Sequence, residues 1–119
     1  MQNEGRKILG HPTLKASTTC VRVPVLRSHS VTVSAQFAKP VDVERAREVI
    51  DSAPGVCVVD NREKMEYPTP LDATMQDDCL VGRIREDLVF KNGLCFWVVG
   101  DQVRKGAALN AVQIAELLA

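Results

Sequence analysis

Three residues that can carry charge interrupt an otherwise strand-like stretch, TCVRVPVLRSHSVTV (residues 19–33). They are Arg22, Arg27 and His29. Burying an unpaired charge is costly, so a buried strand with such residues usually has a partner or a function for them. Arginine can hold a carboxylate through two parallel hydrogen bonds, and histidine titrates near neutral pH and can act as acid and base. The alternatives are a structural ion pair for the arginine and a hydrogen-bonded structural role for the histidine.

Alternate positions on both sides of these residues predict one apolar strand face. Arg27 and His29 interrupt this face, which predicts a break or bulge at residues 26–30, and bulges often re-aim polar side chains beside binding sites. Arg22 and His29 would point to opposite faces of an unbroken strand, because their separation is odd. A break would let both face one pocket. The face consists of Val21, Val23, Val25, Val31, Val33, Ala35 and Phe37.

A second pair of charged residues has helical spacing near residue 1. Residues 2–9 (QNEGRKIL) predict a short helix that ends before Gly10 and Pro12. Glu4 and Lys7 are three residues apart and share a face of this helix, so both could reach one ligand. The alternative is a solvated surface pair.

Length and composition restrict the class of protein. The chain has 119 residues, a size suited to one small domain, and its 15 basic and 15 acidic residues give a net charge of zero, which does not favour nucleic acid. No apolar run is long enough for a membrane helix, and the first residues lack the pattern of a secretory signal. The four cysteines lack metal-ligand spacing, which predicts buried free thiols in a reducing cytoplasm and no metal site.

The remaining pattern predicts an α+β fold, with a mixed, largely antiparallel sheet and helices on one face. Asp42 is a suitable N-cap for an amphipathic helix that Pro54 and Gly55 end. Asn92-Gly93 predicts a hairpin between two strands. The expected elements are a strand in two segments over 20–37, a helix from 42 to 53, strands at 56–60, 79–87 and 93–101, a long surface loop over 61–78 and a final helix over 105–119.

Four motifs occur in an order that resembles the C-terminal part of aspartate-semialdehyde dehydrogenase. They are EGRKILG (4–10), TCVRVPVLRSHSVTV (19–33), LVGRIRED (80–87) and GDQVRKGAALNAVQIAELL (100–118). The resemblance runs along the whole chain and covers about the final third of such an enzyme. It implies a semialdehyde dehydrogenase dimerisation and catalytic domain, an NADP cofactor, a cytoplasmic homodimer or homotetramer, and reduction of L-aspartyl 4-phosphate to the semialdehyde. That reaction leads to lysine (through diaminopimelate), methionine and threonine.

The resemblance also implies roles for individual residues. His29 matches the acid–base histidine, and Arg22 matches the arginine that holds the substrate α-carboxylate. Glu4 matches the glutamate that contacts the substrate amino group, and Lys7 matches the lysine that helps to hold the phosphate. Many relatives have Gly-His-Ser where this chain has Arg-Ser-His-Ser, a difference that affects the loop but leaves His29 in place.

Cofactor contacts are implied near the end of the chain. Gln102 matches a polar amide that contacts NADP, where many relatives have asparagine, and Asn110 is a second candidate near the nicotinamide. We expect residues 1–102 to form part of the substrate-binding and dimerisation domain. Residues 103–119 would then form a C-terminal helix that packs on a nucleotide-binding domain missing from this sequence.

Two parts of such an enzyme are missing from the sequence. The G-x-G-x-x-G fingerprint for dinucleotides does not occur. None of Cys20, Cys57, Cys79 and Cys95 has the context of the nucleophilic cysteine. We therefore expect the chain to be inactive by itself. The alternative hypothesis is a non-catalytic dimerisation or interaction module derived from the same family.

Overall fold

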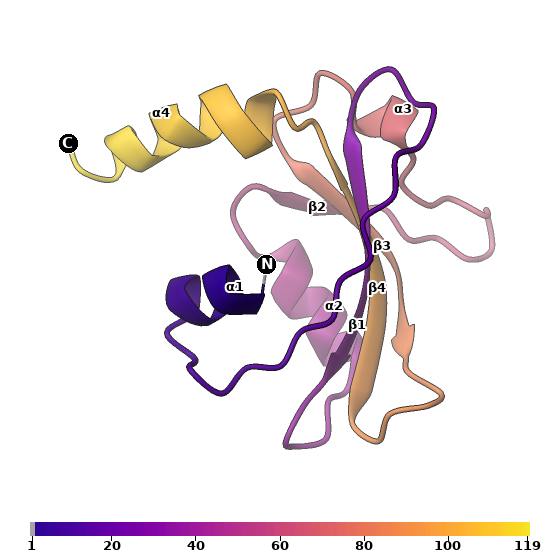
Figure 1. Cartoon of the computed structure of the whole chain (residues 1–119). Helices are drawn as coiled ribbons and strands as arrows, with labels where there is room; N and C mark the ends of the chain where they lie inside the picture. Colours follow the sequence, from indigo (N-terminus) through magenta and orange to yellow (C-terminus); the bar gives the residue numbers. More distant parts are fainter. Residues whose placement is uncertain (1) are drawn as a thin grey trace.

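A four-stranded sheet with helices on both of its faces forms the centre of the protein (Figure 1). The computed structural model describes residues 2–119. Its elements, in chain order, are α1 (Gln2–Ile8), β1 (His29–Gln36), α2 (Val43–Asp51), β2 (Val56–Val58), α3 (Pro70–Ala73), β3 (Cys79–Glu86), β4 (Gly93–Gly100), the π-helical turn η1 (Arg104–Ala108) and α4 (Leu109–Glu116).

The strand order is β1-β4-β3-β2, and the pairing is mostly antiparallel. β4 pairs antiparallel with both β1 and β3, whereas β2 runs parallel to β3. Asn92 has a positive φ of 57° at the turn between β3 and β4, as expected for an Asn-Gly hairpin. The predicted α+β class, the mixed and largely antiparallel sheet and the hairpin are therefore confirmed.

Helix α2 covers one face of the sheet. Asp42 accepts a hydrogen bond from the Arg45 backbone N–H at 2.7 Å, so the predicted N-cap is confirmed. The apolar side of this helix packs on Ile84, Val81 and Leu94, which form the larger buried cluster. The helix residues in that contact are Val43, Ala46 and Ile50.

The opposite face of the sheet meets α3, a helix that the sequence pattern did not predict. Four residues are too few to show helical periodicity, so the 61–78 segment suggested only a loop. Thr69 and Asp72 form a capping box at its start. Ala73 packs in the second buried cluster with Leu80 and Val99. This short helix adds cover on the second face of the sheet.

The first half of the predicted long strand is not a strand. Residues 11–28 have no helix or strand, and Val21, Val23 and Val25 are exposed. The physical reason is the length of the neighbouring strand: β4 ends at Gly100, opposite His29, so residues before His29 have no partner to pair with. The predicted break does exist, since Ser28 has a positive φ of 77° and β1 begins at the next residue.

The final helix projects from the sheet, with the C-terminus at its far end (Figure 1). η1 continues directly into α4, which confirms the predicted C-terminal helix, and α4 has no buried residue. Val112, Ile114 and Leu117 are exposed apolar side chains on it. No helix in residues 2–119 is long and apolar enough to cross a membrane.

Two isoleucines allow a test of the two-sided core. Ile84 is fully buried, whereas Ile114 is 55% exposed on α4. Ile84→Ala should lower the free energy of unfolding by about 2–5 kcal/mol, because it removes buried methyl groups and leaves a cavity. Ile114→Ala, the same substitution on the surface, should change it by only about 0.5 kcal/mol. Denaturant unfolding measures both, and equal effects would contradict the assignment of the core.

The exposure of α4 gives a second prediction. Its backbone amides should exchange with solvent on the order of 100-fold faster than those of Val81 and Val98 in the central strands, because few tertiary contacts protect the helix. Hydrogen exchange read by NMR on the monomeric chain measures this difference. Protection of residues 109–116 equal to that of β3 and β4 would contradict it.

Candidate active site

The end of the sheet where β1 begins and β4 ends holds two of the predicted site residues. His29 is the first residue of β1 and pairs with Gly100, the last residue of β4. Gln102 follows two residues later, so the proposed acid–base and cofactor-binding residues lie at one end of the sheet. Both side chains are exposed. The sequence separation of 73 residues gave no sign of this proximity.

A buried carboxylate, Asp101, organises this end of the sheet. Its side chain is fully buried, and Arg27 Nε lies 2.7 Å from its Oδ2 in an ion pair. Oδ2 also accepts the backbone N–H of Met75 at 2.8 Å, while Oδ1 accepts those of Val103 at 2.9 Å and Arg104 at 3.3 Å. One carboxylate therefore joins the segment before β1, the loop after α3 and the start of η1.

The pKa of Asp101 reflects these contacts. Burial of the carboxyl works to raise its pKa, but the donors from Met75, Arg27, Val103 and Arg104 outweigh burial and hold it at about 2. A carboxyl with such a low pKa remains ionised throughout the neutral range. It therefore keeps its attraction for the Arg27 guanidinium there.

Ser28 completes the connection between Arg27 and His29. It is a buried residue in the left-handed conformation, which is uncommon for residues other than glycine. Its hydroxyl lies 3.1 Å from that of Thr74, which in turn donates to the Pro70 carbonyl at 2.8 Å. The turn before β1 is thus tied to the end of α3 at the residue that precedes His29.

Arg22 lies outside this connected group. It is an exposed residue in the extended segment before the turn, and its side chain makes no hydrogen bond or ion pair within residues 2–119. The same is true of the His29 side chain. The structural alternatives for these two residues, an ion pair and a hydrogen-bonded imidazole, thus have no support among the described contacts. The shared pocket for Arg22 and His29 stays a prediction.

Glu4 and Lys7 are both exposed on α1, and their spacing of three residues places them about one helical turn apart. The helix is fastened to the chain that follows it: Arg6 Nε donates to the Leu14 carbonyl at 2.7 Å, and Gln2 Oε1 accepts the Ala16 N–H at 2.9 Å. Asn110 is exposed on α4. The roles of these three residues stay predictions.

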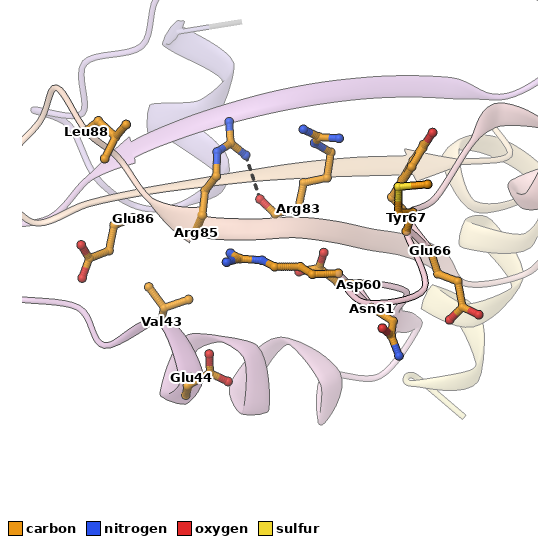
Figure 2. A pocket seen from close by; sticks show the side chains of 12 residues that line it. Val43, Glu44, Asp60, Asn61, Glu66, Tyr67, Arg83, Arg85, Glu86 and Leu88 are labelled. Carbon is orange, nitrogen blue, oxygen red and sulfur yellow. Dashed lines mark hydrogen bonds between the residues drawn. The ribbon is translucent and has the colours of Figure 1, made fainter.

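A cavity lies elsewhere, between the start of α2, the loop after β2 and the irregular part of β3 (Figure 2). Its volume is about 720 Å³. Arg83, at a break in the β3 register with a positive φ of 56°, lies over the Tyr67 ring at 5.7 Å from the centroid. The lining contains no histidine, serine or cysteine, so it offers no serine or cysteine nucleophile beside a histidine. It consists of Val43, Glu44, Asp60, Asn61, Arg62, Met65, Glu66, Tyr67, Arg83, Arg85, Glu86 and Leu88.

Asp60, at the inner side of this cavity, is engaged in structural contacts. Its carboxylate accepts from Arg47 Nη1 at 2.7 Å and from the Ile84 N–H at 3.0 Å. Burial works to raise its pKa, but these donors lower it below the usual value. Asp60 therefore fixes α2 to the irregular part of β3, and a catalytic acid role does not fit it.

The cysteines do not supply a nucleophile in the described structure. The prediction of burial is wrong for Cys20 and Cys57, which are exposed; β2, which carries Cys57, is an edge strand and leaves it uncovered. Burial raises the pKa of the Cys79 thiol, which disfavours the thiolate form. Cys95 donates to Asp87 Oδ2 at 3.1 Å, so its thiol is engaged in a structural contact.

Comparison with known proteins adds a family to this geometry. The family described as semialdehyde dehydrogenase, dimerisation domain, matches residues 1–105. The chain belongs to this family. Among curated relatives, aspartate-semialdehyde dehydrogenase of Synechocystis sp. is 57% identical over 118 residues, and that of Aquifex aeolicus is 53% identical over 118 residues. Each alignment covers 99% of this chain and 35% of the relative.

Solved structures of the semialdehyde dehydrogenase family agree with the fold. Aspartate semialdehyde dehydrogenase II from Vibrio cholerae, complexed with ASA, matches with a TM-score of 0.93 and 41% identity over 99% of this chain and 34% of that one. The enzyme from Francisella tularensis matches with a TM-score of 0.80 and 30% identity over 98% of this chain and 33% of that one. The chain thus spans about a third of the length of these relatives.

The low pKa of Asp101 gives a prediction for stability against pH. The unfolded carboxyl has a pKa of about 3.9, above the folded value of about 2, so the ionised form stabilises the fold. This contribution is complete above pH ~4 and falls as the pH drops toward ~2. Asp101→Asn should lower the free energy of unfolding at pH 7 and flatten its decline between pH 4 and 2. Urea unfolding at a series of pH values measures this, and an unchanged slope would contradict it.

Proposed function

We propose that the chain is the dimerisation and substrate-binding part of an NADP-dependent aspartate-semialdehyde dehydrogenase. Such an enzyme reduces L-aspartyl 4-phosphate to L-aspartate 4-semialdehyde, in the synthesis of lysine, methionine and threonine. The observation that carries the proposal is the 57% identity to the Synechocystis enzyme over 99% of the chain. The similarity to the Vibrio cholerae enzyme, whose structure is described as a complex with ASA, supports it.

His29 is the acid–base residue in this proposal. Its imidazole is exposed at the end of β1 and makes no hydrogen bond within residues 2–119, so it is available to an incoming ligand. It would accept the proton of a cysteine thiol supplied by another part of the enzyme, and return a proton later in the reaction. Arg22, also without a side-chain partner, would hold the substrate α-carboxylate in a bidentate manner.

The amino and phosphate groups of the substrate are assigned to Glu4 and Lys7. Their opposite charges suit an ammonium and a phosphate, and both side chains are exposed on one turn of α1. These assignments rest on the resemblance and the helical spacing.

NADP would supply the hydride. Gln102 offers an exposed side-chain amide beside the His29 end of the sheet, which suits a cofactor contact, and Asn110 offers another on α4. The chain lacks a glycine-rich phosphate loop, so most of the cofactor site would belong to another domain. Residues 103–119 would pack on that domain and cover the exposed Val112, Ile114 and Leu117.

The assembly would be a cytoplasmic homodimer or homotetramer. The family description as a dimerisation domain supports self-association. The alternative is a non-catalytic dimerisation or interaction module. An apolar groove of about 470 Å³ favours this reading, since it would suit a protein partner. It lies between α2 and the β1–β4 side of the sheet and includes Phe37, Val49, Ile50, Leu94 and Phe96.

A chimera tests the proposal. The chain would replace the matching third of the Synechocystis enzyme, and reduction of NADP with the semialdehyde and phosphate would be followed. The chimera should turn over, whereas the 119-residue chain alone should not. His29→Ala should lower kcat by about 100- to 10,000-fold, because the proton acceptor is lost. Arg22→Ala should mainly raise KM.

His11 supplies the matched control. It is the other histidine of the chain, exposed in the loop after α1 with Thr13 Oγ1 3.3 Å from its ring. His11→Ala should leave kcat unchanged. A folded chimera without turnover would favour the non-catalytic module, and equal effects of the two alanine substitutions would exclude His29 as the acid–base residue.

A further inference from the structure

Asp101 does not touch the His29 side chain, but it is connected both to the segment before His29 and to the strand that pairs with His29. Along β4, it follows Gly100, the partner of His29 in the sheet. Along the segment before β1, it holds Arg27, two residues before His29. The backbone of His29 is therefore held between a strand pairing and a buried ion pair. Small rotations of β1 about its first residue would disturb one or the other.

The same carboxylate fixes Gln102. Oδ1 accepts the N–H groups of Val103 and Arg104, the two residues after Gln102, and so sets the direction in which the chain leaves β4. A single buried group thus contacts the chain two residues before His29 and directly after Gln102. A fixed relative position is what an acid–base group and a cofactor contact require, since misplacement by about 1 Å can cost 100-fold in rate.

The contacts need a carboxylate at this position. Oδ2 accepts the Met75 N–H and lies in an ion pair with Arg27, and Oδ1 accepts the N–H groups of Val103 and Arg104. A carboxylate accepts at both oxygens, whereas an asparagine amide would turn its NH₂ toward donors in either orientation. Asparagine has nearly the same shape, so it tests the charge and the acceptors without creating a cavity.

We propose that Asp101 is a positioning residue that holds His29 and Gln102 in their working geometry through Arg27 and the start of η1. The consequence for catalysis rests on the proposed function; the consequence for geometry does not. The sequence predicted that Arg27 would need a partner or a function, but it did not identify Asp101 as that partner.

The test uses Asp101→Asn in the chimera, with Asp87→Asn as the matched control. Asp87 also accepts four donors, from the side chains of Ser34 and Cys95 and the N–H groups of Val89 and Phe90, but it lies at the opposite end of β4. Asp101→Asn should lower kcat on the order of 100-fold, with less change in KM. Asp87→Asn should leave kcat near the parent value.

Rescue by a conservative change separates positioning from general destabilisation. Arg27→Lys retains a cation for Asp101 and should keep more activity than Arg27→Met, even where the two variants have equal melting temperatures. Equal kcat values for the two, or an Asp87→Asn effect as large as that of Asp101→Asn, would overturn the proposal.

If the chimera is inactive, NMR chemical shifts of the 119-residue chain still test whether Asp101 positions His29 and Gln102. In Asp101→Asn, the His29 ring and the amides of residues 28–30 and 102–104 should shift, while Ile84 and Leu94 in the core stay unchanged. In Asp87→Asn, the signals of the His29 ring and of residues 28–30 and 102–104 should keep their positions. Unshifted His29 signals in Asp101→Asn would overturn the proposal, whereas an inactive parent chimera with shifted signals would count against the proposed function alone.

Discussion

The pairing of β4 with strands on both sides is the constraint on which the rest of the structure depends. β4 is antiparallel to β1 over the full eight residues of each, and it also carries β3. Its alternate side chains enter both buried clusters, with Trp97 and Val99 toward α3, and Phe96 and Val98 toward α2. Since β4 ends at Gly100, β1 can begin only at His29. The position of the proposed acid–base residue is thus set by the length of a neighbouring strand.

Carboxylates at the two ends of the β4 hairpin stabilise this arrangement in similar ways. At the turn, Asp87 accepts the N–H groups of Val89 and Phe90 and the side chains of Ser34 and Cys95, and hydrogen bonds, first that from Ser34, hold its pKa far below the usual value. At the other end, Asp101 does the same for the chain leaving β4. The difference lies in burial: Asp101 is enclosed and needs Arg27 as a partner. Asp87 is a turn cap near the surface.

Local sequence signals predicted the elements that local forces specify. The Asp42 cap, the period of α2, the Asn92-Gly93 turn and the C-terminal helix all depend on residues close in sequence. The family resemblance was confirmed by the match to residues 1–105. Strand pairing is different, because alternating Val21, Val23 and Val25 have the pattern of a strand whether or not a partner exists. The end of β4 decided against it.

The ion pair between Arg27 and Asp101 was missed for the same reason. The two residues are 74 positions apart, and each has an ordinary local explanation: a changed loop residue, and an acid after a strand. The signal that could have been read is the acid placed just before η1, since carboxylates commonly accept the N–H groups at a helix start. The pairing of Asp101 with Arg27, in the turn before β1, follows only from the tertiary structure.

The surfaces left exposed agree with a chain that works as part of a larger assembly. The apolar side chains of residues 21–26, the apolar residues of α4 and the unpaired edge of β1 are open to solvent in the described structure. Exposed apolar surface and an open strand edge are unfavourable for an independent protein and typical of interfaces. Arg22 lies in the first of these surfaces and Asn110 in the second. The relatives are about three times as long as this chain, and their additional residues would cover these surfaces. The residues proposed to touch substrate and cofactor would then face parts of the enzyme that lie outside this chain. The geometry around Asp101 would be the part of the site that this chain supplies by itself.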